Sequence, residues 1–431
     1  MYQTRAVLQL TVAAVLFCGL TYAEQAVEPK GTSAGQREWS DFRGPERAGI
    51  ADETGLLRSW PENGPEVLWR RALGNGFSGI SVAGNHLYTL FSDEKDEYAA
   101  AFLLSDGSEV WRRRLGKKFF DEWGNGPRAT PTIGGEILYV LGSQGMLMAL
   151  QRLTGDVAWQ LDLEEAFPGT DGIERLANYT PPDPNVDPGE FAYTSSPLLD
   201  GNLLLVYTGS EGKSLVAINK STGAVRWTAL DKLGGYSSPI AVSIHDQRQI
   251  IAIMHEDLLG VGTDGELLWN YHLGWSSTQP IFVPPHSLMV NGALDVGAQL
   301  LEIDTGEDGW SVTQIWHNHR LRHAYSSPVV YEGKIFGFDN ATLRCLDLSN
   351  GEILWSRRGF GKGTVTMADG LLFVLGDLGT LWLAEASSEG FEERGRIPVF
   401  EGRRTWTAPT PAQGRLFLRD HEEMVALRLK E

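Results

Sequence analysis

A short motif recurs along the chain: a small residue, any residue and a proline. Large aromatic and basic side chains stand just before many of its copies. Three residues before the proline, or next to that position, stand Arg128, Tyr193, Tyr236, Trp275, Tyr325, Lys362 and Trp406, with Thr194 and Ser277 in two further copies. Rings and cations of this kind could stack on a planar anionic ligand or take a peptide segment. Alternatively, the rings simply fill space. We treat the first seven residues as candidate ligand- or partner-binding residues.

Motifs that would indicate catalysis are missing from the sequence. It contains no G-x-S-x-G, no H-E-x-x-H, no P-loop and no C-x-x-C-H. The stretch 74–79 is rich in glycine, but it leads into a predicted strand rather than a helix, so we interpret it as a turn. We therefore predict no catalytic residue.

Histidine and cysteine offer little for a metal site. His317 and His319 share a face if their segment is a strand, but zinc needs at least a third ligand, and His323 is too close in sequence to place. The neighbouring Arg320 and Arg322 disfavour a cation. We predict a solvated loop here and no metal. Cys345 occupies a slot that holds alanine in sister repeats, which favours a small core residue over a nucleophile.

The elements that must position these residues come from a repeated strand–turn–strand pattern, seen at 147–159, 215–227 and 343–355. Each copy has a turn glycine and a tryptophan four residues later, flanked by the period-2 alternation of strands. The anchor tryptophans are Trp111, Trp159, Trp227, Trp269, Trp316 and Trp355. Most intervals between them run from 39 to 48 residues and one is 68, a period typical of four-stranded propeller blades.

Two further repeats complete the count. A degenerate seventh runs from about 364 to 397, with Arg394 near the tryptophan position, and an eighth begins at Trp406 and stops before its outer strand. The strand around Trp69 resembles the last strand of a repeat and has no partners nearby. We predict an all-β, eight-bladed β-propeller of four-stranded antiparallel blades, closed by this N-terminal strand, because closure removes an exposed edge.

This repeat, with its small-x-Pro, Leu-Tyr-Val, Ala-Leu-Asp-x-x-Thr-Gly and Trp pattern, resembles that of the PQQ-like (pyrroloquinoline quinone repeat) β-propeller family over 66–429. The resemblance implies that a repeat tryptophan docks on a glycine of the neighbouring blade, a role that falls to Trp111, Trp159, Trp227, Trp269 and Trp355. One branch contains quinoprotein alcohol and sugar dehydrogenases, with a vicinal cysteine pair over the quinone. This chain has no such pair, and no calcium-binding set can be matched. Of the branches of this family, the chain most resembles the secreted non-enzymatic members, such as the BamB-like scaffold.

The N-terminal segment predicts export. Residues 1–23 have a basic Arg5, an apolar run and a small-x-small site, as in a signal peptide cleaved near Ala23. Cys18 would allow lipidation, but Phe17 before it disfavours that alternative. We expect a flexible linker over 24–38, an ordered lead-in over 39–65 and a single propeller domain over 66–431.

The net charge of the chain excludes some classes of binding partner. The net charge of −18 argues against nucleic acid and against an anionic membrane surface. We expect a periplasmic or secreted monomer, not an integral membrane protein, that binds a protein or a small molecule at the mouth of the central channel. The insertion over 162–191 could cover that mouth as a lid. The alternative function is a PQQ-dependent alcohol or sugar dehydrogenase with calcium; otherwise no cofactor is expected.

Overall fold

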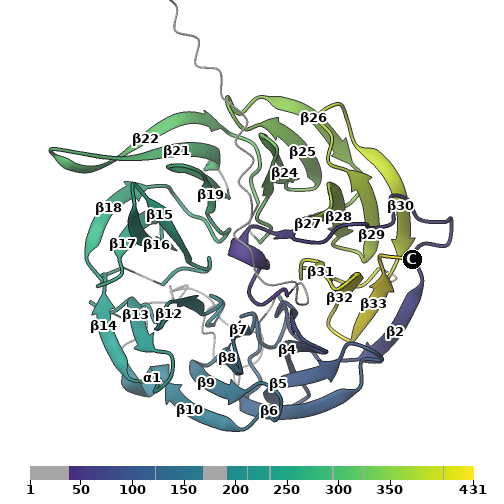
Figure 1. Cartoon of the computed structure of the whole chain (residues 1–431), viewed down its shortest axis with the longest axis horizontal. Helices are drawn as coiled ribbons and strands as arrows, with labels where there is room; N and C mark the ends of the chain where they lie inside the picture. Colours follow the sequence, from purple (N-terminus) through teal and green to yellow (C-terminus); the bar gives the residue numbers. More distant parts are fainter. Residues whose placement is uncertain are drawn as a thin grey trace, which may run out of the picture. The chain divides into compact units, whose positions relative to one another are not determined.

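The structure, a computed structural model, describes residues 38–121, 123–167, 192–210, 212–232, 234–293, 296–323, 325–400 and 402–431. The described residues belong to one compact unit, Gln36–Glu431. Eight sheets stand around a common centre (Figure 1), which confirms the predicted eight-bladed propeller. The predicted signal peptide, nearly all of the predicted linker and residues 168–191 of the proposed lid lie outside the described residues.

Each of the first four blades is an antiparallel meander that runs outward from the centre. Blade 1 contains β3 (Ser81–Ala83), β4 (His86–Ser92), β5 (Asp96–Leu103) and β6 (Glu109–Lys117); blade 2 contains β7 (Thr132–Gly134), β8 (Ile137–Leu141), β9 (Met146–Gln151) and β10 (Val157–Asp162); blade 3 contains β11 (Leu198–Asp200), β12 (Leu203–Tyr207), β13 (Leu215–Asn219) and β14 (Val225–Ala229); blade 4 contains β15 (Ile240–Ile244), β16 (Gln247–Met254), β17 (Asp257–Gly262) and β18 (Leu267–His272). A single turn of helix, α1 (Leu163–Ala166), follows β10.

The other four blades continue the ring. Blade 5 contains β19 (Ile281–Val283), β20 (Ser287–Gly292), β21 (Gly297–Gly306) and β22 (Gly309–Asn318); blade 6 contains β23 (Val329–Tyr331), β24 (Lys334–Asp339), β25 (Thr342–Asp347) and β26 (Ile353–Arg358); blade 7 contains β27 (Gly363–Ala368), β28 (Leu371–Gly376), β29 (Thr380–Glu385) and β30 (Glu392–Pro398); blade 8 contains β31 (Thr410–Ala412), β32 (Arg415–Arg419), β33 (Glu423–Arg428) and β2 (Val67–Ala72). The β21–β22 hairpin projects beyond the rim of the ring (Figure 1).

The apolar core lies between neighbouring blades. Tyr139 and Leu147 of blade 2, for example, pack with Leu204 and Val216 of blade 3. The second and third strands of a blade are buried on both faces, which explains their nearly continuous apolar sequences. Outer strands are mostly exposed and carry a register shift before the anchor tryptophan, as in β14. Such bulges bend the outermost strand and discourage pairing with another chain.

Anchor tryptophans fasten most blades to the next. The ring of Trp111 lies over Gly155 so closely that a Cβ there would be 2.6 Å from it, and the Trp111 Nε1 donates a hydrogen bond to Arg152 O at 2.9 Å. The same arrangement joins Trp69 to Gly107, Trp159 to Gly223, Trp227 to Gly265 and Trp316 to Gly351. These glycines have positive φ, about 70 to 94°, where a side chain would be strained.

Two tryptophans depart from the docking that the family resemblance implies. Trp269 packs on Gly260 of its own blade and donates to Gln249 Oε1 at 2.8 Å. In the next blade β21 and β22 are ten residues long, so their turn lies farther out than the turns of other blades. Its glycines, Gly306 and Gly309, are therefore not in contact with Trp269. Trp355 donates to Ser387 O at 2.7 Å in blade 7 and meets Phe391 edge-on, without a glycine contact.

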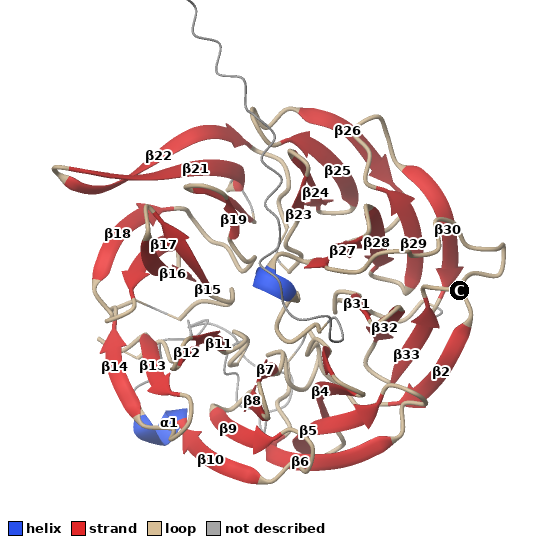
Figure 2. Ribbon diagram, in the orientation of Figure 1, coloured by secondary structure: helices blue, strands red, loops and turns tan. Residues whose placement is uncertain are grey.

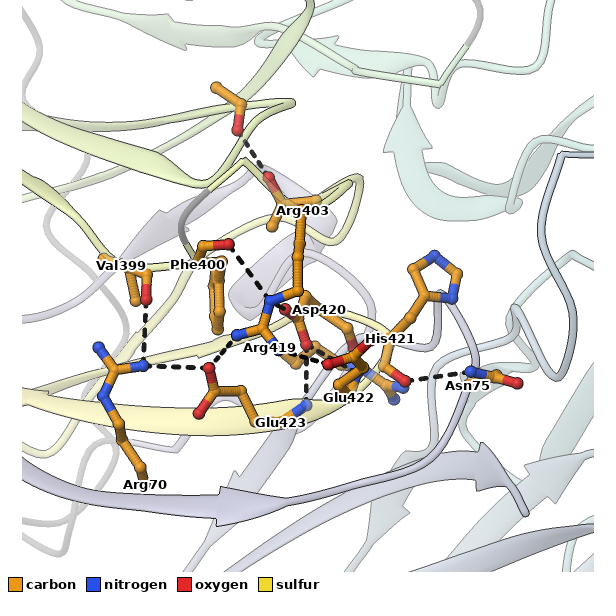
Figure 3. Close-up of polar contacts among 12 residues, drawn as sticks. Arg70, Asn75, Val399, Phe400, Arg403, Arg419, Asp420, His421, Glu422 and Glu423 are labelled. Atoms are coloured by element: carbon orange, nitrogen blue, oxygen red, sulfur yellow. Dashed lines mark hydrogen bonds and ion pairs between the residues drawn. The ribbon is translucent and has the colours of Figure 1, made fainter. Parts of the chain in front are cut away.

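The ring closes where β2 pairs antiparallel with β33, as predicted. Figure 3 shows the polar contacts that support this closure, including Arg70, which donates to Val399 O and Glu423 Oε1. The fully buried Arg419 donates to Leu90 O at 2.6 Å and Gly76 O at 3.1 Å, so blade 8 is tied to blade 1 through backbone oxygens.

The lead-in runs into the centre of the ring before β2 begins. Trp39 forms a bridge with Val82 of blade 1, the short 3-10 helix η1 (Pro45–Arg47) follows, and β1 (Ile50–Ala51) pairs parallel with β27. Figure 2 shows this helix in the middle of the ring. The sequence predicts an ordered segment here but not its path through the channel.

Two buried arginines hold the lead-in to the blades. Arg43 donates to Ser327 O at 2.8 Å and to Pro328 O in blade 6. Arg47 donates to Pro197 O and to Pro239 O, in blades 3 and 4, and forms an ion pair with Asp41 at 2.7 Å. The lead-in therefore donates hydrogen bonds to carbonyl oxygens at the starts of inner strands.

Candidate functional site

A cavity of about 450 Å³ opens at the end of the channel where the inner strands begin. We call it the cup. Six of the seven candidate residues line it, namely Arg128, Tyr236, Trp275, Tyr325, Lys362 and Trp406. Tyr193 does not: it is buried in the core of blades 2 and 3, against Gly145. The repeat register brings side chains from separate blades to one place, and of the candidates beside that register Trp275 and Lys362 reach the cup whereas Tyr193 does not.

The floor of the cup is made by the lead-in, through Trp39, Phe42 and Arg43. Because η1 and Arg47 within it occupy the channel below (Figure 2), the cavity is a blind cup rather than an open pore. Arg43 is 5% exposed, and burial lowers its pKa to about 9, so its guanidinium remains charged at neutral pH. Sequence reasoning missed these floor residues.

Aromatic rings form two walls. On one side Tyr325 of blade 6 stacks on Trp406 of blade 8 with ring centroids 4.7 Å apart, and Phe77 stacks on the same tryptophan at 5.1 Å. On the other side Tyr236 of blade 4 and Trp275 of blade 5 lie 6.4 Å apart. Large rings at a preformed concavity provide apolar faces against which a flat ligand can stack.

The side chains that line the cup include three cations and no described carboxylate, although the carboxylates of Asp121 and Asp377 lie behind this lining. Arg43, Arg128 and Lys362 line the cavity, whereas no aspartate or glutamate is among its described lining residues, in a chain with 55 acidic residues. Arg128 is neutralised in part by Asp121, 3.3 Å away. The ammonium group of Lys362 forms no ion pair with a described carboxylate, but it lies near enough to Asp377 to oppose the rise that burial causes in the pKa of that carboxyl group. This distribution favours an anionic ligand.

His323 lies at the blade 6 wall of the cup and is 3% exposed. Its Nδ1 is within hydrogen-bond distance of the backbone N–H groups of Tyr325 and Ser326, at 3.3 and 3.1 Å. Nδ1 is therefore the acceptor, and Nε2 carries the proton. Burial, with a smaller contribution from Lys362, lowers the pKa of His323 to about 3, so the ring is neutral. Its position two residues before Tyr325 was the only signal in the sequence.

The histidine pair and the cysteine lie outside the cup. The rings of His317 and His319 lie 4.2 Å apart, and His317 Nε2 contacts Val296 O. No group of three histidine, cysteine or acidic residues suited to a metal occurs among the described residues. Cys345 is buried in the core of blades 6 and 7, and burial raises its pKa to about 12, which leaves a protonated, unreactive thiol at neutral pH.

Fold and site together define a β-propeller built from PQQ-like repeats, with a plugged channel and one aromatic, cationic cup. A family model described as outer membrane protein assembly factor BamB matches residues 46–182, 95–280 and 295–427. The chain belongs to this family.

Relatives come from both branches of the propellers. BamB of Yersinia pestis is 25% identical over 309 residues, which cover 64% of this chain and 69% of that protein. The quinoprotein alcohol dehydrogenase PedH of Pseudomonas putida is 30% identical over 163 residues, which cover 35% of this chain and 24% of that enzyme.

Solved structures show the same fold at low identity. BamB from Moraxella catarrhalis has a TM-score of 0.56 at 15% identity, with 85% of this chain and 98% of that chain covered. The quinohemoprotein alcohol dehydrogenase from Comamonas testosteroni has a TM-score of 0.62 at 10% identity, with 91% and 80% covered. In the described part of the chain, no helix has the length and apolar character needed to cross a membrane.

Proposed function

We propose that this protein is a non-catalytic binding module, exported from the cytoplasm, whose working site is the cup. The observation that carries the proposal is the cup itself: a blind concavity with two aromatic walls and a cationic lining free of carboxylates among its described residues. Aromatic and arginine side chains at a concave site are the types that contribute most to binding energy. The match to BamB supports a protein partner in the cell envelope, and the predicted signal peptide supports that location.

The alternative, a PQQ-dependent dehydrogenase, requires a site for the quinone and calcium. Calcium prefers six to eight oxygen ligands, carboxylates above all. The described lining of the cup contains no carboxylate. Arginine and lysine side chains line it instead, and their positive charge would repel a calcium ion. The vicinal cysteine pair is absent from the sequence. These residues do not fit calcium-bound PQQ.

Partner capture tests the binding role. The wild-type protein and the Tyr325→Ala/Trp406→Ala variant are crosslinked in the native envelope fraction, and bound proteins are compared. Each substitution should weaken binding by about 2 kcal/mol if both rings are hot spots. A matched control, Trp310→Ala/Tyr331→Ala, removes two half-buried rings outside the cup. Equal capture by all three proteins would place the working surface elsewhere, on the blade edges or the opposite face.

Turnover tests the alternative. The protein is incubated with PQQ and calcium and assayed for dye reduction over a panel of alcohols and sugars. We expect no rate above the protein-free control, because nothing in the described cup holds the metal. Robust turnover that depends on both PQQ and calcium would overturn the non-catalytic proposal.

A further inference from the structure

Five buried polar atoms without hydrogen-bond partners among the described residues belong to side chains that line the cup. They are Arg43 Nε, His323 Nε2, Tyr325 Oη, Ser326 Oγ and Thr364 Oγ1. Four of these residues are at most 5% exposed. A buried polar group without a partner is costly, and native proteins contain few. Five in the lining of one cavity indicate that something outside the described chain satisfies them.

Four of the five atoms, those of Arg43, His323, Tyr325 and Ser326, belong to one sector of the cup, at the start of blade 6, and Thr364 lines the cavity from β27 of blade 7. Arg43 donates through its terminal nitrogens to Ser327 O and Pro328 O, which places its guanidinium against the segment that contains Ser326. The ring of Phe338 lies 6.0 Å from that of His323 and would be 2.6 Å from a Cβ at Gly363, which places the start of β27 beside His323. Lys362 precedes this glycine and lines the same cavity.

The chemistry of the sector is that of a donor set. Arg43 Nε and His323 Nε2 can only donate, the second because Nδ1 already accepts from two backbone N–H groups. The three hydroxyl groups can donate as well, and the Lys362 ammonium adds a charge. Two N–H donors, hydroxyls and a cation together match the oxygens of an anion.

We propose that this sector is a carboxylate subsite and that the cup binds a small organic acid with a flat body. The carboxylate accepts from Arg43, His323 and the hydroxyls near Lys362, while the body of the ligand lies between the Trp406 and Trp275 walls. This inference rests on the proposed binding function and names its ligand class. The five atoms are covered in the present conformation, and the Tyr325 ring lies edge-on to His323 at 4.4 Å. Binding therefore includes a shift of Tyr325.

An aromatic acid and an acidic sugar share this chemistry, so the test uses a matched pair of probes for each. Calorimetry on the purified protein compares 2-naphthoate with the neutral 2-naphthamide, and galacturonate with galactose. We expect the acid of one pair to bind at least about tenfold more tightly than its neutral partner, the effect of hydrogen bonds to a charged group. Whichever pair shows the preference identifies the source. Equal binding within both pairs, binding by no probe, or tighter binding of inorganic phosphate than of either acid would overturn the carboxylate subsite.

Two substitutions separate a ligand role from a structural one. Thr364→Val keeps the shape of the side chain and removes a buried hydroxyl that has no partner, so the ligand-free protein should be as stable as wild type or more stable. Affinity for the acid should nevertheless fall about fivefold to tenfold. His323→Asn keeps an acceptor for the backbone N–H groups and removes the Nε2 donor, with the same expected loss.

A charge control completes the design. Lys362→Gln should lower the affinity for the acid probe about tenfold. Lys334→Gln, the same change outside the cup in blade 6, should leave that affinity within about twofold of wild type. Equal losses in the two lysine variants, or wild-type affinity in Thr364→Val and His323→Asn, would contradict the subsite. The failures are distinguishable from those of the binding function. If the Tyr325→Ala/Trp406→Ala variant still captures the partner, only the binding proposal is contradicted. If that variant loses the partner but the wild-type protein binds acid and neutral probes equally, only the subsite is contradicted.

Discussion

Arg47→Met tests whether the lead-in holds the ring together from within. Arg47 is 3% exposed and lies in η1, at the centre of the propeller. Its guanidinium donates to both carboxylate oxygens of Asp41, at 2.7 and 2.9 Å, and to backbone carbonyl oxygens of blades 3 and 4. Methionine keeps an unbranched apolar stem and removes every one of these donors.

The expected loss follows from what the substitution leaves behind. Removing one partner of a buried ion pair typically costs 3–5 kcal/mol, because the other charge stays buried without compensation. Asp41 keeps hydrogen bonds from Phe42 N and Thr132 Oγ1, which places the expectation at the lower end, about 3 kcal/mol. That is a large part of a typical stability of 5–15 kcal/mol.

Urea unfolding measures the loss, and limited proteolysis shows whether the lead-in is released first. Arg58→Met is the matched control, since Arg58 also lies in the lead-in but is 51% exposed and pairs with Glu385 at the surface. Its loss should be at most about 1 kcal/mol. If Arg47→Met unfolds within about 1 kcal/mol of the control and its lead-in is cleaved no faster, the reasoning about the central plug is wrong.

Two further predictions concern pH and the blade anchors. Burial lowers the pKa of His323 to about 3 and that of His421 to about 4, so between these values and about pH 6.5 the unfolded chain binds protons that the folded chain does not. Stability should therefore fall as pH drops from 6.5, by up to about 1.4 kcal/mol per unit for each histidine, and urea midpoints for His323→Asn should show a shallower fall. A slope unchanged in that variant would contradict the buried, neutral ring. Gly155→Ala places a Cβ 2.6 Å from the Trp111 ring at φ +73°, whereas Gly135→Ala meets nothing within 4 Å at φ +65°. Both incur strain of roughly 1–2 kcal/mol, and thermal unfolding should show Gly155→Ala to be lower by a further 1–3 kcal/mol; equal melting temperatures would argue against docking at this glycine.

Much of the fold and part of the site could be predicted because both follow from the repeat. The spacing of the anchor tryptophans, the alternation of apolar residues and the orphan strand around Trp69 were enough to predict eight blades and their closure. The same register predicted which side chains meet at one end of the channel, since equivalent positions of a closed ring lie at equivalent heights. Tyr193 stands one residue before the register position, and its side chain lies in the core of blades 2 and 3 instead of the cup.

Tertiary structure alone decided what lies inside the ring. Arg43 and Arg47 bind carbonyl oxygens of distant inner strands, and every residue has a carbonyl oxygen, so no pattern in the sequence identifies the partner. The lead-in thereby turns an open channel into a cup. The unpaired polar atoms of His323 and Thr364 likewise exist only once two blades and the lead-in have packed around them. Local sequence determined the blades because the apolar strands, the turn glycine and the tryptophan recur within each short repeat. The plug and the donor set depend instead on contacts between the lead-in and segments hundreds of residues away.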